Sequence, residues 1–146
     1  MGEKRPRASR HVPLLLLALA VVIGCRRGSD VEVLEHSGKW ESGYGAKFYN
    51  VVGRLRNSTT HPLAYVKLRI DALDKAGTVV ASTETYNESA EVLGVPEVDG
   101  HALLAQGKIK QIPPGGEERF RGSFLDEETP PFESYRVTVT ETPAAQ

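Results

Sequence analysis

The chain has 146 residues, of which 40% are hydrophobic, and a formal net charge of −1 at pH 7. This is the size of one ordinary domain, and the charge excludes the strong basic excess that is typical of a nucleic-acid-binding domain. A single Cys in the whole chain excludes an internal disulfide. The core must therefore be held by burial alone, and a domain of about 120 residues can bury about two thirds of its unfolded surface.

The first 24 residues have the layout of a secretory signal peptide. Residues 1–11 carry four Lys or Arg and one Glu, and residues 12–23 are apolar throughout. A basic region followed by an apolar one is typical of such a signal. The apolar run is shorter than the roughly 20 residues that a membrane-spanning helix needs. We therefore expect residues 1–24 to be removed on export.

The end of this segment matches a lipobox, formed by Val22, Ile23, Gly24 and Cys25. The signal peptidase cuts after a small side chain, and the Cys sulfur receives a diacylglyceryl group through a thioether. Cys25 is the only Cys in the chain, and a single Cys in an exported protein calls for an explanation. Lipidation of Cys25 supplies one. The alternative is an ordinary signal peptide followed by a free thiol.

Lipidation of Cys25 also predicts where the protein resides. Residues 25–30 would form the lipidated Cys and a short polar tether, whose five extended residues reach roughly 17 Å. We expect the acyl chains to anchor an exported domain close to the bacterial membrane. Arg26, in place of the Asp that retains enterobacterial lipoproteins at the inner membrane, favours the outer membrane or its periplasmic leaflet.

The remaining chain reads as a series of short strands. The clearest strand lies in residues 66–72, where Val66, Leu68, Ile70 and Ala72 alternate with Lys67, Arg69 and Asp71. A period of two is typical of a half-buried strand. The register predicts that Ile70 and Phe124 are buried and that Lys67 and Arg69 are exposed.

Further strands are expected on both sides of this one. Residues 47–57 and 78–86 should form three successive antiparallel strands with it, and Asp74 and Gly77 suit the second turn. A first strand is expected at residues 31–35, followed over residues 36–46 by a strand edge and then a loop with a turn at Gly43-Tyr44-Gly45. Others are expected at 108–112, 119–124 and 135–139. The absence of alternating helices predicts an all-β, two-layer antiparallel sandwich of six to seven strands over residues 31–142. Residues 143–146 should be a disordered tail.

Residues 88–112 form a long irregular connection, here called the insertion. Asp99 can cap a short helix that runs through Gln106 and ends at Gly107. Long connections in compact domains are often functional, so we consider Leu103 and Leu104 as binding candidates. The alternative is that the apolar residues of the insertion pack on an open sheet edge.

Parts of the chain resemble the FxLYD domain, an immunoglobulin-like β-sandwich module of bacterial envelope proteins. The resemblance lies in residues 52–57 (VGRLRN), in residues 70–74 (IDALD), and in Pro114-Gly115 followed by Phe120. Of the family's Phe-x-Leu-Tyr-Asp signature only Asp74 is kept. The resemblance implies an immunoglobulin-like topology with no catalytic residues.

No catalytic or cofactor motif is visible in the sequence. A nucleophile needs a base and a supporting group, and His36, His61 and His101 share no short motif with a Ser or an acid. Metal-ligand spacing and a phosphate-binding glycine loop are both missing. We therefore expect a protein without enzymatic activity, cofactor or metal, and treat an enzyme built on these histidines as a distant alternative.

Two groups of side chains are weaker binding candidates. Arg54, Arg56, Arg119 and Arg121 lie at outward positions of two strands that would pair, where they can face lipid phosphates or an acidic partner. The alternative is a solvated face neutralised by Glu32 and Glu35.

Trp40, Tyr44 and Tyr49 form the second group. They can line an edge that binds sugar or peptide, or they can serve ordinary packing.

The sequence therefore predicts a lipid-anchored envelope protein with a non-catalytic domain. Its role would be protein-protein interaction or structural support at the membrane, with an envelope protein as partner and no nucleic acid. The alternative within binding proteins is an adhesin-like module for glycan or peptide. The sequence predicts neither the partner nor the oligomeric state, since fold alone does not identify either.

Overall fold

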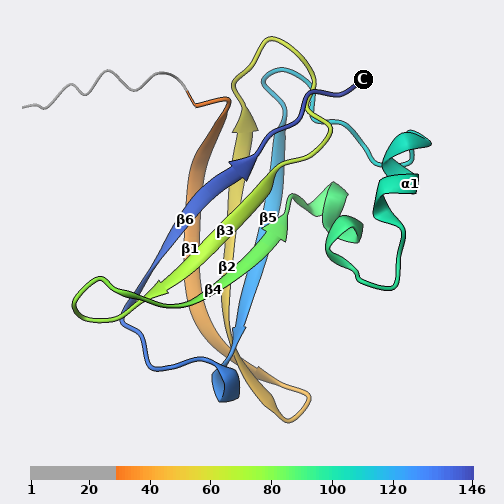
Figure 1. The fold of residues 1–146 in the computed structure, drawn as a ribbon. Coiled ribbons are helices and arrows are strands. Elements are labelled where there is room, and N and C mark those ends of the chain that lie inside the picture. Colours follow the sequence, from red (N-terminus) through yellow and green to blue (C-terminus); the bar gives the residue numbers. More distant parts are fainter. Residues whose placement is uncertain (1–28) are drawn as a thin grey trace, which may run out of the picture.

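The computed structural model describes residues 29–146 (Figure 1). The predicted signal peptide, the lipobox and Cys25 therefore lie outside the described residues. The strands are β1 (Val31–Gly43), β2 (Ala46–Asn57), β3 (Lys67–Leu73), β4 (Val79–Tyr86), β5 (Glu117–Leu125) and β6 (Ser134–Glu141). The helices are the 3-10 helices η1 (Glu88–Gly94) and η2 (Asp126–Glu128) and the α-helix α1 (Gly100–Ala105).

The six strands form two antiparallel sheets of three strands each, in the orders β1-β2-β5 and β4-β3-β6. These orders correspond to strands A-B-E and C′-C-F of an immunoglobulin-like sandwich. The predicted all-β antiparallel sandwich is confirmed, with six strands among residues 29–146. The single α-helix in the insertion is confirmed as well, and the Asp99 side chain caps it by accepting a hydrogen bond from the Ala102 amide at 2.9 Å.

The first strand is longer than predicted. The sequence indicated a strand at residues 31–35 and then a loop, whereas β1 continues to Gly43 and pairs with β2 along its whole length, with one register shift between Val33 and Glu35. The two strands are joined by Tyr44 and Gly45, which both have positive φ (53° and 78°). A loop of two such residues matches the twist of the strands it joins. Pairing with β2 thus orders a segment whose own pattern is weak.

The path from β2 to β3 also differs from the prediction. These strands were expected to be neighbours, but they belong to different sheets, and of the three strands expected in succession only β3 and β4 form a hairpin. Residues 58–66 cross the end of the sandwich, with Leu63 and Val66 fully buried. The short strand expected at residues 108–112 is reduced to a bridge between Ile112 and Leu63.

The C-terminal residues are ordered, which corrects the expectation of a disordered tail over residues 143–146. The Ala64 amide donates to the Pro143 carbonyl at 2.8 Å, and the Ala145 amide donates to the Pro62 carbonyl at 2.9 Å. The tail thus runs as an extended segment beside the crossing loop, where its backbone groups find partners.

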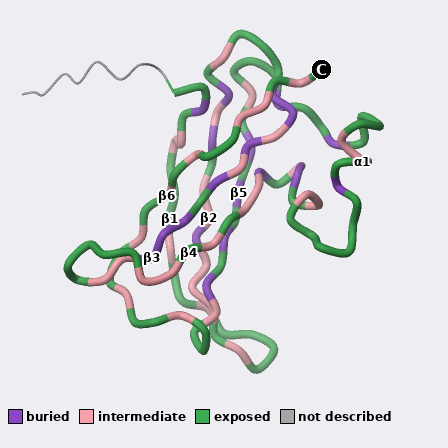
Figure 2. Tube along the Cα trace, viewed as in Figure 1, coloured by how far each residue is buried: buried purple, intermediate pink, exposed green. Residues whose placement is uncertain are grey.

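The core lies between the two sheets and is densest along β2, β3 and β5 (Figure 2). Ile70 is fully buried and Phe124 is 4% exposed, so the predicted strand register is confirmed at both positions. Arg69 is exposed, as predicted. Lys67 is not: its side chain is only 17% exposed because the ammonium group bonds Glu84 at 2.9 Å and Glu141 at 3.5 Å.

A glycine in β2 creates space for the largest core side chain. Gly53 pairs with Phe120 of β5, and a Cβ at Gly53 would lie 2.4 Å from the Phe120 ring and 2.6 Å from the Glu35 carbonyl oxygen. Both distances are far below van der Waals contact. The ring therefore packs across the strand where a side chain would otherwise stand.

Asp71 departs from the simple alternation of β3. The pattern places it on the solvent face, yet it is 3% exposed. Its carboxylate accepts hydrogen bonds from Ser82 at 2.6 Å, Arg136 at 2.9 Å and Arg69 at 2.7 Å. The bonds from Ser82 and the two arginines lower the pKa of Asp71 to about 2.

The register of β3 predicts which side chains carry stability. Truncating Ile70 to Ala should lower the free energy of unfolding by about 2–5 kcal/mol, because it leaves a cavity in the core. Thr138→Ala, on the exposed face of β6, is the matched control and should change it by less than about 0.5 kcal/mol. Urea melts of the purified protein measure both. Equal losses would mean that the strand register is wrong.

Asp71 predicts acid sensitivity. Its folded pKa lies below its ordinary value of 3.8, so the ionised form stabilises the folded state above about pH 4. This contribution, about 2 kcal/mol, is lost as the pH falls through about 2. Urea melts between pH 6 and pH 2 should show less change for Asp71→Asn than for the unaltered protein. Identical pH profiles would contradict the assignment.

Candidate functional site

The four predicted arginines share the outer face of the β1-β2-β5 sheet. Arg54 stands directly opposite Arg119 in the register between β2 and β5, and Val52 stands opposite Arg121. Like charges directly opposite each other on a sheet are destabilising unless they are compensated. The surrounding carboxylates therefore decide what this face can bind.

Arg54 and Arg56 are neutralised within the domain. The Arg54 guanidinium donates to Glu35 at 2.8 Å and to Glu117 at 3.0 Å. Arg56 donates to Glu117 at 2.8 Å and lies 3.8 Å from Glu32. The pKa of Arg54 is raised by its bond to Glu35, and that of Arg56 by its bond to Glu117. Neutralisation by Glu32 and Glu35 was the predicted alternative. Glu117 is a third acid, which the sequence did not reveal.

Arg119 and Arg121 have weaker or no ionic partners. Among residues 29–146 no carboxylate lies within 4.0 Å of the Arg119 guanidinium, and Arg121 has only Glu41 at 4.0 Å. Both arginines are exposed. The predicted stripe of four is therefore two arginines of β2 in ion pairs and two arginines of β5 that face solvent. We call Arg119 and Arg121 the arginine pair.

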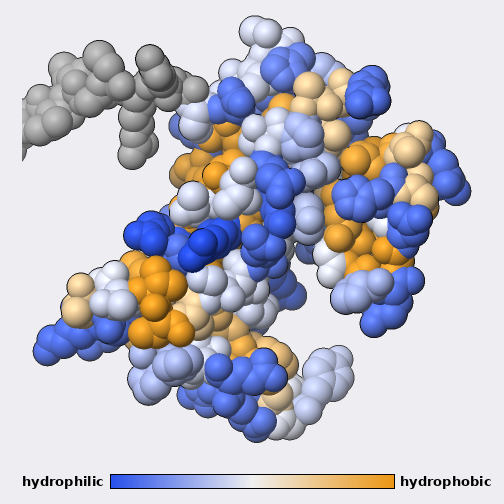
Figure 3. Space-filling view, in the orientation of Figure 1, coloured by the Kyte–Doolittle hydropathy of each residue, from blue (hydrophilic) through white to orange (hydrophobic). Residues whose placement is uncertain are grey.

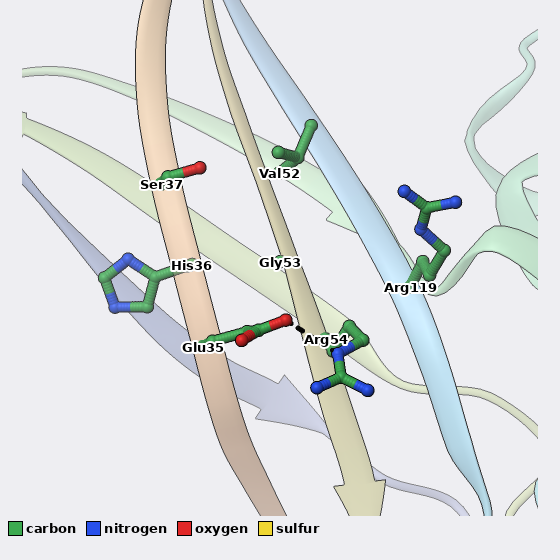
Figure 4. Close-up of a pocket in the computed structure, with 7 residues that line it drawn as sticks. All are labelled: Glu35, His36, Ser37, Val52, Gly53, Arg54 and Arg119. Carbon is green, nitrogen blue, oxygen red and sulfur yellow. Dashed lines mark hydrogen bonds and ion pairs between the residues drawn. The ribbon is translucent and has the colours of Figure 1, made fainter.

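The arginine pair borders shallow hollows in the sheet surface. The first has a volume of about 470 Å³ and is lined by Glu35, His36, Ser37, Val52, Gly53, Arg54 and Arg119 (Figure 4). In this view the Arg54 side chain joins Glu35, whereas Arg119 extends from β5 without a partner among the residues drawn. Arg119 also lines two adjoining hollows of about 360 and 350 Å³. The face is open and shaped for contact with a surface rather than for enclosing a small molecule.

The histidines are not brought together. His36 lies on β1, where its Nδ1 is 2.9 Å from the Tyr135 hydroxyl. His61 lies in the crossing loop and His101 in α1. Among residues 29–146 no three His, Cys, Asp or Glu side chains are grouped as metal ligands. The three histidines thus lie in three separate elements of the described chain.

The predicted aromatic group is divided by the fold. Trp40 and Tyr49 pack edge to face with ring centroids 5.3 Å apart, and both contact Phe132. Tyr44 is separate, fully exposed at the tip of the β1–β2 hairpin. The sequence missed Phe132 and Tyr135, which lie more than 80 positions from Tyr49 but pack against it. Most of this group therefore serves packing between β1 and the β6 side, which was the predicted alternative.

The insertion is attached to the core through its first turn. Ala90 is fully buried, and the Ser89 hydroxyl donates to the buried carboxylate of Glu118 at 2.9 Å. Leu103 and Leu104 are half-buried. Leu104 lines a hollow of about 400 Å³ between α1 and the C-terminal residues. Apolar surface remains around α1 (Figure 3), with Val95 and Val98 exposed.

Comparisons of the chain with family models, with curated proteins and with solved structures find no match. Within residues 29–146 no helix has the length and apolar character needed to cross a membrane.

Proposed function

We propose that the protein is an exported lipoprotein whose β-sandwich is a non-catalytic binding module of the bacterial envelope. Cys25 would carry the acyl chains, and the arginine pair would contact an acidic surface of another envelope protein. The lipobox and the preceding basic and apolar segments support the anchor. The resemblance to the FxLYD domain supports the same compartment.

The position of the arginine pair relative to the tether fits this role. Asp30, the last residue of the proposed tether, accepts a hydrogen bond from the Ser58 amide at 3.0 Å and one from the Thr142 hydroxyl at 3.3 Å. This fixes the start of the domain at the end that carries the crossing loop and the C-terminus (Figure 1). That end would face the membrane, and the arginine pair would point sideways toward a neighbouring protein.

Arg119 has no ionic partner within residues 29–146, and this observation carries the proposal. The neighbouring arginines Arg54 and Arg56 each hold two carboxylates within 4.0 Å. A guanidinium bonds a carboxylate through two parallel N–H groups, so a planar acidic side chain suits it better than a point charge does. An acidic protein surface therefore offers Arg119 and Arg121 the bonds that the domain itself does not.

An adhesin-like module remains the second candidate, because Tyr44 is fully exposed and Trp40 is 41% exposed. Both lie toward the end of the sandwich away from the proposed anchor, where an adhesin would present its binding side chains. The Trp40 face, however, is already covered by the Lys47 ammonium at 4.6 Å. This contact leaves less of the indole ring free for a sugar.

The anchor predicts a labelling result. Cells that express the protein should incorporate radioactive palmitate into it, and Cys25→Ser should abolish the label and leave the signal segment uncleaved. Two or more acyl chains hold a protein stably at a membrane. The variant should therefore also leave the membrane fraction or remain there only as precursor. Unlabelled wild-type protein would contradict the lipoprotein proposal.

The arginine pair predicts a loss of partner contact. Arg119→Glu/Arg121→Glu should lower the yield of crosslinked complexes in intact cells by about tenfold or more, because it removes the charge-assisted contacts to the partner. A tenfold loss of affinity corresponds to roughly 1.4 kcal/mol of binding free energy. Lys75→Glu/Lys108→Glu changes the total charge by the same amount at exposed sites elsewhere and is the matched control. Equal crosslinking in both variants would contradict the role of the arginine pair.

A further inference from the structure

One edge of the sandwich has no neighbouring strand. The sheet order ends at β6, whose pairing among residues 29–146 is with β3 alone. The opposite side of β6 therefore presents a row of backbone N–H and C=O groups without a strand partner. In seven-stranded immunoglobulin-like domains a further strand pairs at this position.

Two of the other edges are closed by the fold. β4 and β5 lie beside each other, and η1 contacts both. The Thr85 hydroxyl donates to the Arg121 carbonyl, and Asn87 forms a bridge with Phe120. These contacts join the two sheets along that side of the sandwich.

The edge of β1 is interrupted rather than closed. Its register shifts between Val33 and Glu35. Such irregularities protect edges against pairing.

Within residues 29–146 the β6 edge is regular from Ser134 to Val139, and its one register shift falls at Thr140, near the end of the strand. Residues 135–140 read Tyr-Arg-Val-Thr-Val-Thr, without Pro, Gly or Lys, and β-branched and aromatic residues of this kind favour strands. Tyr135, Val137 and Val139 face the core, yet all three are only half-buried. Their counterparts on β3, Leu68 and Ile70, are fully buried. The apolar layer is thus incomplete along β6.

We propose that β6 binds an extended segment of another envelope protein, which adds a fourth strand to the β4-β3-β6 sheet. The backbone of the added strand would form hydrogen bonds with the unpaired N–H and C=O groups of β6. Its alternate apolar side chains would cover Tyr135, Val137 and Val139. Strand addition of this kind takes affinity from main-chain hydrogen bonds and specificity from the alternate side chains. The proposal is independent of the arginine pair, which lies on the outer face of the other sheet.

The charges at the ends of β6 define the segment further. Glu133 precedes the strand. At its other end lie Asp30, close to Thr142, and Glu141, which already accepts a hydrogen bond from Tyr65 at 2.9 Å and lies 3.5 Å from the Lys67 ammonium. Arg136 in the middle is already bonded to Asp71. A segment with Lys or Arg at both ends and β-branched apolar residues between them therefore fits this edge.

A second copy of the chain fits the edge poorly, an argument that rests on the proposed anchor. β6 ends beside Asp30, so two antiparallel β6 strands would place the two tethers at opposite ends of the pair. Copies anchored in one membrane cannot adopt that arrangement with tethers of roughly 17 Å. A two-fold pair with parallel strands would put the apolar face of one sheet on the polar side of the other.

A labelled peptide tests the proposal. The probe is acetyl-Lys-Val-Thr-Val-Thr-Val-Lys-amide with a fluorophore, titrated by anisotropy against the full-length lipidated protein in zwitterionic nanodiscs. Val137→Lys places an inward-pointing charge on the edge and should weaken binding at least tenfold. Thr138→Lys adds the same charge on the outward face of β6 and should stay within about threefold. Arg119→Glu/Arg121→Glu should bind the peptide normally, which separates this proposal from the proposed function.

Two modified peptides keep the test decisive if Val137→Lys does not fold. N-methylation of the Val amides in one peptide, and of the Thr amides in the other, preserves all side chains. In an added strand only one of these two sets donates to β6, so one peptide should bind and the other should not. The proposal would be overturned if both N-methylated peptides bind, or if neither they nor the unmodified peptide bind. Equal binding of the unmodified peptide to Val137→Lys and Thr138→Lys would also overturn it. Dimerisation of the protein through β6 without peptide would overturn it in favour of a second copy.

Discussion

Two sheets of only three strands must enclose one core, and the closure of the two open sides between them governs much of the structure. On one side η1 covers β4 and β5, and the Asn87–Phe120 bridge joins the sheets. On the other side the aromatic rings of Trp40, Tyr49, Phe132 and Tyr135 fill the gap between β1 and β6. Aromatic side chains thus close the β1/β6 side of the sandwich, and η1 together with the backbone bridge closes the β4/β5 side.

The outer faces of the two sheets differ in how their arginines are paired with carboxylates. The β4-β3-β6 face holds the buried carboxylate of Asp71 between two exposed arginines, Arg69 and Arg136, and these ion pairs stabilise the sheet. The β1-β2-β5 face satisfies Arg54 and Arg56, whereas none of the carboxylates that the structure describes pairs with Arg119. Because surface ion pairs contribute little to stability, the arrangement on this second face matters more for what it can bind than for the fold.

Local chemistry explains which features could be predicted from the sequence. The alternation in β3 and the Asp74 side chain, which accepts from the Ala76 and Thr78 amides, act within a few residues. The long β1, the ordered tail and the role of Glu117 depend on partners far away in the chain. Residues such as Ser37 and Gly38 have little strand propensity of their own, so their place in β1 is decided by pairing with β2. For the site, the shared face of the arginines was predictable from strand alternation. Which of these arginines form ion pairs could not be predicted, because that depends on the register between β2 and β5.

Native-state hydrogen exchange of the β6 amides tests the central claim, that side chains fill the gap between β1 and β6 while the outer backbone edge of β6 stays free in the described part of the chain. The amides of β2 and β3 should exchange only through unfolding of most of the domain, since these are the central strands of the two sheets. Along β6, alternate amides should be protected like those of β3, while the intervening amides should exchange at nearly the rate of an exposed loop. Uniform slow exchange along all of β6 would show that this edge is already covered and would contradict the account.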